Sequence, residues 1–168
     1  MDITREHTPD PWICHANGKF YMTFTGNDRV PLWSATSLID FYDRPEKGPV
    51  FRARDSGPVS ERLWAPELHC LQGRWYIYFA GADKTVGNRS HRMYVLGGPS
   101  EGEDPHAGGW ELRGPIRKMD QNQWALDVTV FEIDGTLYFC YSGWPRRDDT
   151  ESGWEERSEK IQQLLSSH

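Results

Sequence analysis

Residues 72–79 read Gln-Gly-Arg-Trp-Tyr-Ile-Tyr-Phe, and two other segments of the chain repeat this pattern. Residues 17–24 read Asn-Gly-Lys-Phe-Tyr-Met-Thr-Phe, and residues 134–141 read Asp-Gly-Thr-Leu-Tyr-Phe-Cys-Tyr. The three segments recur at intervals of 55 and 62 residues, with the tyrosine of the fifth position in register. Internal similarity at a period of this size indicates a repeat architecture.

Each repeat contains a strand, a tight turn and a second strand. Asn-Gly and Asp-Gly are strong hairpin signals, because both central positions of the favoured turn need a positive φ. The strand after each turn is apolar on both faces, which indicates burial on both sides. Propeller blades stack face against face and bury their strands in this way. The sequence therefore predicts an all-β fold, namely a partial β-propeller.

The repeats divide the chain into units of unequal completeness. We expect blades at about residues 10–54, 63–118 and 124–144, so that residues 1–144 form about two and a half blades. The pattern stops near Trp144, two strands into the third unit. Residues 145–168 begin with a charged and polar run, and we expect this tail to be disordered or to form a short helix.

Composition narrows the class of partner. The chain carries a net charge of −6, and its 19 Lys and Arg residues are scattered, which argues against a nucleic-acid partner. Aromatic residues make up 13% of the chain, and aromatic rings stack on flat apolar faces such as those of sugars. No signal peptide, membrane-spanning segment, metal site or cofactor is predicted, and the location of the protein stays open.

Acidic residues occupy one position of the repeat in two of the three units. Asp10 and Asp127 each precede the glycine of their turn by eight residues. The second unit has Ala65 at this position and Glu67 two residues later. Because the innermost strand of each blade lines the central channel, acids that begin these strands can converge. The competing interpretation is that Asp10, which precedes a proline, and Asp127 are turn or cap residues.

Paired carboxylates suit the hydrolysis of glycosidic bonds. Inversion needs a base that activates water and an acid that protonates the leaving oxygen, about 6.5–9.5 Å apart. A third carboxylate can raise the pKa of the acid, because like charges resist ionising together.

Three segments around these acidic residues carry the further signal, namely Pro9-Asp10-Pro11-Trp12-Ile13, Leu63-Trp64-Ala65-Pro66-Glu67-Leu68-His69 and Trp124-Ala125-Leu126-Asp127. They resemble signatures of glycoside hydrolase family 43, whose members are five-bladed propellers acting on arabinose- and xylose-containing polysaccharides. The segment His91-Arg92-Met93-Tyr94-Val95-Leu96 is similar to the α-L-arabinofuranosidase-like branch. The resemblance covers about residues 9–144.

The resemblance implies roles for individual residues. Asp10 matches the general base, and Asp127 matches the aspartate that raises the pKa of the general acid and orients it. Glu67, Trp64 and Trp144 are assigned to substrate binding. The general acid of the family is a glutamate before Gly-Pro in a later blade, and no residue of this sequence matches it. The chain therefore resembles a C-terminally truncated member.

One residue departs from the branch pattern. Val128 stands where this branch usually has glycine after the aspartate. We expect a valine here to crowd the channel-facing backbone and to shift Asp127 or narrow the sugar subsite.

The function expected from these observations is that of an inverting glycosidase of the α-L-arabinofuranosidase or β-xylosidase type, weak or inactive without its acid. The alternative is a non-catalytic propeller fragment that binds carbohydrate. A protein-interaction propeller is disfavoured, because its repeat signatures are absent. A retaining hydrolase of the sucrose type is disfavoured by the signature in the second unit. The sugar, the polymer and the choice between endo and exo action stay open.

Overall fold

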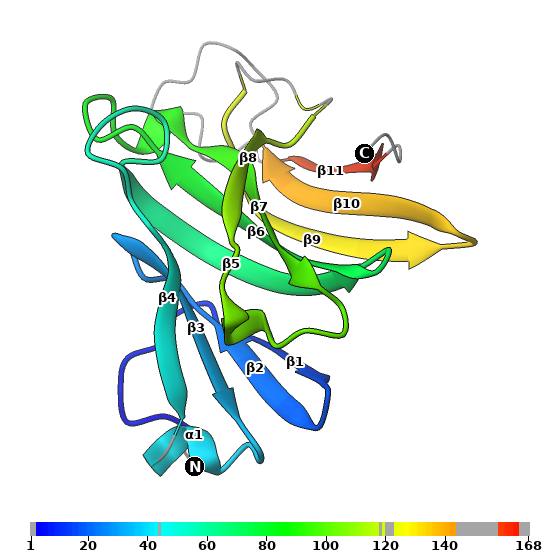
Figure 1. Ribbon diagram of the computed structural model, residues 1–168. Helices are drawn as coiled ribbons and strands as arrows, with labels where there is room; N and C mark the ends of the chain where they lie inside the picture. Colours follow the sequence, from blue (N-terminus) through cyan, green and yellow to red (C-terminus); the bar gives the residue numbers. More distant parts are fainter. Residues whose placement is uncertain (1–2, 44, 118, 120–122, 144–157, 165–168) are drawn as a thin grey trace.

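The computed structural model describes residues 3–43, 45–117, 119, 123–143 and 158–164, and it contains three antiparallel sheets (Figure 1). The first sheet comprises β1 (Trp12–Ala16), β2 (Lys19–Thr23), β3 (Arg29–Ala35) and β4 (Glu46–Arg52), with a short helix α1 (Asp40–Asp43) before β4. The second comprises β5 (Glu61–Leu71), β6 (Arg74–Ala82), β7 (Arg92–Ser100) and β8 (Glu111–Pro115). The third comprises β9 (Ala125–Ile133), β10 (Thr136–Gly143) and β11 (Ser158–Leu164).

Within each sheet, every strand pairs with the next strand along the chain. Such a four-stranded meander is one blade of a propeller, and the first two sheets each form a complete blade. Figure 1 shows the sheets arranged one after another, with the innermost strands β5 and β9 side by side. The prediction of an all-β, partial propeller is confirmed.

The three turns of the repeat share one backbone conformation. Their first residues, Asn17, Gln72 and Asp134, have φ values of 50°, 49° and 50°. The glycines that follow have φ values of 73°, 80° and 75°. Two successive residues with positive φ make the two-residue hairpin turn whose twist matches that of the flanking strands. The turn prediction therefore holds even where glutamine replaces the favoured asparagine.

Hydrophobic clusters fill the space between sheets. The cluster between the first and second sheets is built from Tyr21, Val30, Leu32, Leu63, Leu68, Trp75, Ile77, Phe79, Tyr94 and Leu96, with Val59 from the segment that joins them. The cluster between the second and third sheets includes Tyr78, Ala80, Met93, Trp124, Val128, Val130, Phe139 and Tyr141. Alternate residues of β6 thus face opposite neighbours, which explains why this strand is apolar on both faces.

The tail contains a strand that the sequence did not predict. Ser158–Leu164 forms β11, which pairs antiparallel with β10 from Leu137↔Leu164 to Gly143↔Ser158. The expectation of disorder or a short helix is therefore wrong for this segment. An unpaired strand edge exposes a row of backbone donors and acceptors, and pairing with that edge outweighs the weak local preference of a polar segment.

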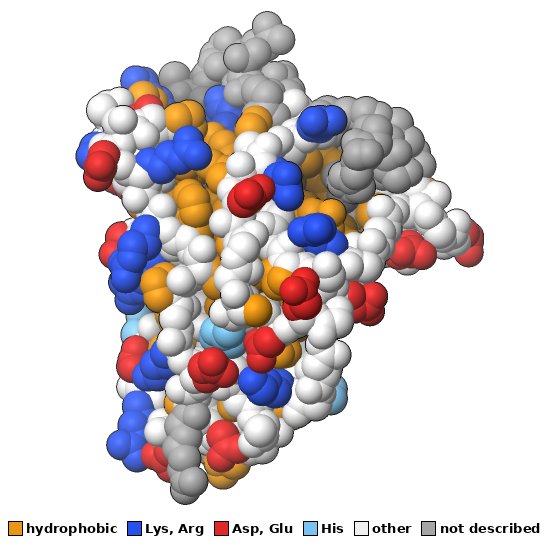
Figure 2. Space-filling model, in the orientation of Figure 1, with side chains coloured by type: hydrophobic (Ala, Val, Ile, Leu, Met, Phe, Trp, Pro, Cys, Tyr) orange, Lys and Arg blue, Asp and Glu red, His pale blue; other side chains and the backbone are white. Residues whose placement is uncertain are grey.

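Charges of both signs are distributed over the surface. Figure 2 shows Lys and Arg side chains interspersed with Asp and Glu side chains on the face in view. No helix in the described part of the chain is long and apolar enough to cross a membrane.

Candidate active site

The innermost strands of the three sheets are neighbours, since β1 contacts β5 and β5 contacts β9. Asp10, just before β1, shares one position of the repeat with Ala65, within β5, and Asp127, within β9. Their φ values are 53°, 42° and 54°. Non-glycine residues seldom adopt positive φ, although aspartate does so more readily than alanine. Because Ala65 shares the conformation, the blade architecture imposes it, and two of the three blades place a carboxylate there.

Bulges accompany this conformation in the second and third sheets. The pairing of β5 with β6 jumps from Trp64↔Ala80 to Glu67↔Tyr78, which leaves two residues of β5 opposite one of β6. The pairing of β9 with β10 jumps in the same way between Leu126↔Ser142 and Thr129↔Cys140. A bulge turns side chains away from the regular alternation of a strand, and bulges are common beside active sites. Ala65 and Asp127 are the first residues of these two bulges.

The structure corrects the expectation for Val128. Its side chain is fully buried in the cluster between the second and third sheets, whereas the preceding Asp127 is exposed. These consecutive side chains thus lie on different faces of β9. Val128 therefore packs in the core and does not crowd the channel.

Thr25 joins the start of β1 to the start of β5. Its hydroxyl group donates to Oδ2 of Asp10 at 2.7 Å and accepts the backbone N–H of Ala65 at 2.8 Å. Its own backbone N–H donates to the carbonyl oxygen of Pro9 at 2.9 Å. No motif in the sequence marks Thr25, because it is a lone threonine between strands.

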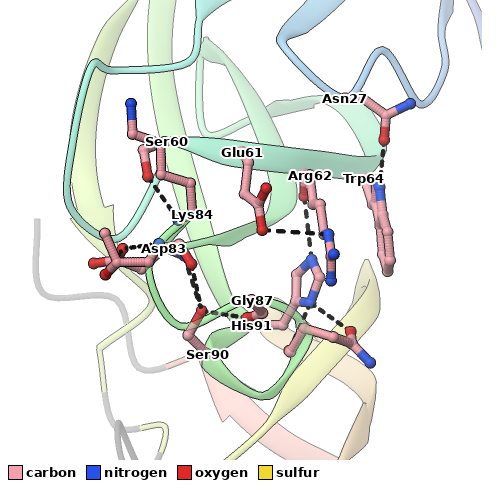
Figure 3. Close-up of polar contacts among 12 residues, drawn as sticks. Asn27, Ser60, Glu61, Arg62, Trp64, Asp83, Lys84, Gly87, Ser90 and His91 are labelled. Carbon is pink, nitrogen blue, oxygen red and sulfur yellow. Dashed lines mark hydrogen bonds and ion pairs between the residues drawn. The ribbon is translucent and has the colours of Figure 1, made fainter.

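Trp64 lies between two polar residues, as Figure 3 shows. Its indole Nε1 donates to Oδ1 of Asn27 at 2.8 Å, and its ring stacks on His91 with centroids 4.4 Å apart. The backbone N–H of Leu63 also donates to the carbonyl oxygen of Asn27, at 2.9 Å. These contacts hold one ring face of Trp64 against the protein. Trp64 is half-buried, and its role in sugar binding stays a prediction that concerns the part of the ring not held by these contacts.

His91 is buried, and its ring nitrogens contact Asn88 and Arg62. Its Nδ1 lies 2.9 Å from both the carbonyl oxygen and Oδ1 of Asn88, and its Nε2 lies 3.2 Å from the carbonyl oxygen of Arg62 (Figure 3). Burial lowers the pKa of His91 below its ordinary value, although the nearby oxygens favour the charged ring. His91 is thus a buried polar residue, and both nitrogens of its ring have hydrogen-bond partners.

The loop that carries His91 also supports the third sheet. The carbonyl oxygen of His91 accepts the backbone N–H of Ala125 at 3.2 Å. The carbonyl oxygen of Asn88 accepts Nε1 of Trp124 at 3.1 Å. Ala125 is two residues before Asp127, so these bonds help to set the start of β9. A series of contacts thus connects the Asp10 region, the second sheet and the Asp127 region.

Glu67 takes part in a different cluster. Its Oε2 lies 2.9 Å from Nε2 of His69, and the ring of His69 lies 4.9 Å from that of Trp12. The Glu67 side chain is 18% exposed. Trp12 in turn donates from Nε1 to the carbonyl oxygen of Leu68 at 2.9 Å. Glu67 therefore has a protein partner, and its assignment to substrate binding stays a prediction.

Trp144 lies outside the described residues. Within those that are described, no group of three or more His, Cys, Asp or Glu residues is placed to hold a metal ion.

The chain matches the family described as glycosyl hydrolases family 43 over residues 3–165. It belongs to this family. An extracellular exo-α-(1→5)-L-arabinofuranosidase of Streptomyces avermitilis is 34% identical over 87% of this chain and 29% of the relative. α-L-Arabinofuranosidase 43 of Humicola insolens is also 34% identical, over 86% of this chain and 29% of the relative.

Solved structures show the same fold. The α-L-arabinofuranosidase of Lactobacillus brevis superposes with a TM-score of 0.78 at 26% identity, covering 95% of this chain and 50% of that one. The endo-arabinase of Bacteroides thetaiotaomicron superposes with a TM-score of 0.74 at 14% identity, over 98% of this chain. The family 43 chain described here thus spans about half the length of these solved relatives and under a third of the two curated relatives.

Proposed function

We propose that this family 43 chain supplies the base and the pKa-modulating carboxylate of an inverting glycosidase that acts on arabinose- or xylose-containing saccharides. The observation that carries the proposal is the shared position of Asp10 and Asp127, each on left-handed backbone at the start of an innermost strand. Support for the sugar class comes from the relatives named as arabinofuranosidases.

Each carboxylate has a distinct part in the proposed reaction. Asp10 accepts a proton from water as the water oxygen attacks the anomeric carbon, and the bond from that carbon to the leaving oxygen breaks. A general acid gives its proton to the leaving oxygen, so that protons and charge balance. Asp127 is proposed to keep that acid protonated by like-charge repulsion. Both aspartates are exposed to solvent, as groups that meet a substrate must be.

The general acid decides which substrates react. No glutamate of this sequence has the Gly-Pro context of the family's acid. General acid catalysis contributes about 10²–10⁴-fold, and an activated leaving group needs little of it. We therefore expect this chain to hydrolyse a dinitrophenyl α-L-arabinofuranoside or β-D-xyloside far faster than the matching alkyl glycoside.

Substitution of Asp10 tests the assignment of the base. We expect Asp10→Asn to lower kcat on the dinitrophenyl glycoside by about 10²–10⁴-fold, because the amide cannot take the proton of water. Asp127→Asn is expected to have a smaller effect on this substrate, since its partner acid is not needed. Initial rates measured at saturating substrate provide the comparison.

Asp134→Asn is the matched control, because Asp134 is also an exposed aspartate with positive φ, in the turn between β9 and β10. It should leave kcat unchanged. Equal losses in Asp10→Asn and Asp134→Asn would contradict the assignment of the base.

Two further measurements separate the alternatives. NMR of the first product anomer distinguishes inversion from the retention expected of a hydrolase of the sucrose type. Titration with arabino-oligosaccharides tests the binding alternative. Binding without any released sugar, even from the activated glycoside, would favour a non-catalytic carbohydrate-binding role.

A further inference from the structure

We propose that Thr25 is a positioning residue for Asp10, and that it sets the orientation of this carboxylate from the backbone of the second blade. The inference rests on the proposed role of Asp10 as the base. The role proposed for Thr25 is carried by the three hydrogen bonds that Thr25 makes with Pro9, Asp10 and Ala65.

The hydrogen bonds of Thr25 determine the direction of its hydroxyl proton. A threonine hydroxyl has one proton to donate and two lone pairs. The N–H of Ala65 occupies one lone pair at 2.8 Å, so the proton of Thr25 is directed to Oδ2 of Asp10 at 2.7 Å. A hydrogen bond to a carboxylate is stronger than one between neutral groups. Because Oδ2 is held in this way, we assign Oδ1 of Asp10 as the oxygen that accepts the proton of water.

Without this bond, the side chain of Asp10 would reorient. Asp10 is exposed, and an exposed side chain changes rotamer freely on a fast timescale. A base that must meet a water at one face of the anomeric carbon works in only a narrow range of orientations. Thr25 also binds the carbonyl oxygen of Pro9 through its backbone N–H, which ties the backbone before Asp10 to the same residue.

Ala65 contributes to this arrangement through its backbone. Its backbone has a φ of 42°, at the bulge of β5, and this strained conformation presents its N–H to Thr25. This repeat position carries a carboxylate in the first and third units. In the second unit, Ala65 acts through its backbone N–H. The orientation of the base in one blade depends on the backbone of the next.

The test compares two substitutions of Thr25 with a control at Thr23, the last residue of β2. Thr25→Val keeps the shape and removes the hydroxyl, and we expect it to lower kcat on the dinitrophenyl α-L-arabinofuranoside by about 10–100-fold, with KM nearly unchanged. Thr25→Ser keeps the hydroxyl and should restore most of kcat. Thr23→Val is the control, because the Thr23 hydroxyl also bonds the second blade, at the carbonyl oxygen of Pro66, without touching a carboxylate.

Thr23→Val should lower the melting temperature and leave kcat unchanged. The positioning role would be overturned if Thr25→Ser or Thr23→Val lost as much kcat as Thr25→Val. General loosening of the contact between the blades would then explain the loss.

A double-mutant cycle measured by melting temperature tests the contact between Thr25 and Asp10 without any need for turnover. We expect Thr25→Val to lower the melting temperature by about 2–4 °C more in the wild-type background than in Asp10→Gly, where no carboxylate is left to hold. Glycine is chosen because it accepts the positive φ of position 10. Equal shifts in both backgrounds overturn the inference. If the wild-type chain releases no sugar, the proposed hydrolysis fails, and this cycle alone decides whether Thr25 holds Asp10.

Discussion

At one position of the repeat, each of the three units holds a residue other than glycine in the left-handed region. Asp10 and Asp127 suit this conformation, whereas Ala65 gains nothing from it and carries the cost of its Cβ, about 1–2 kcal/mol. Strain of this kind persists only where the surrounding structure imposes it, and it is common at functional sites. The backbone N–H of the strained Ala65 donates a hydrogen bond to the hydroxyl group of Thr25.

At the scale of the residue, His91 makes stability depend on pH. Burial lowers its pKa below the ordinary 6.5, so the unfolded chain binds a proton more readily than the folded one. The contribution of His91 to the free energy of unfolding is therefore complete above pH 6.5 and is lost as pH falls from 6.5 towards the folded-state pKa. We expect His91→Gln to flatten the fall in stability between about pH 7.5 and about pH 5, measured by urea unfolding.

His15→Gln is the control for this prediction, because His15 is exposed on β1. It should leave the pH dependence of the wild type in place. A pH dependence that is unchanged in His91→Gln would show that another group is responsible.

At the scale of the element, the hairpin turn of each blade needs glycine because of its backbone conformation. A side chain at this position would have enough space. A Cβ added at Gly73 meets no atom within 4 Å, yet the φ of Gly73 is 80°. Gly73→Ala should therefore cost about 1–2 kcal/mol in the free energy of unfolding, through conformation alone.

Gly48 of β4 also has open space around its added Cβ, and its φ is not in the left-handed region. Gly48→Ala should change stability by no more than about 0.5 kcal/mol, or raise it slightly, in the same urea titration. A cost at Gly48 that equals the cost at Gly73 would mean that the turn conformation is not the cause.

At the scale of the whole molecule, the blades are held together by apolar side chains that they share. Ile77 is fully buried and lies in the same cluster as Tyr21 and Leu32 of the neighbouring sheet. Ile77→Ala should lower the free energy of unfolding by about 2–5 kcal/mol and speed hydrogen exchange in β2 as well as in β6.

Ile133, whose exposed fraction is 52%, gives the comparison. Ile133→Ala should change stability by less than about 0.5 kcal/mol. Ile77→Val, with an expected cost of about 0.5–1.5 kcal/mol, keeps the test possible if the alanine variant does not fold. Faster exchange confined to the second sheet would indicate that the blades unfold independently.

The sequence by itself determined the repeat, the hairpin turns, the all-β propeller and the equivalence of Asp10 with Asp127. These features depend on the local chemistry of the turns and on apolar patterns within single strands, both of which can be seen along the chain.

Only the tertiary structure decided the rest. Thr25 and Asn27 matter through contacts with Ala65 and Trp64, about 40 residues away along the chain, and no local pattern marks such pairs. Val128 is buried because its side chain packs in the cluster between the second and third sheets, and such packing depends on a neighbouring sheet far away in the sequence. The segment 158–164 is a strand because the edge of β10 accepts it, although its own residues favour no strand.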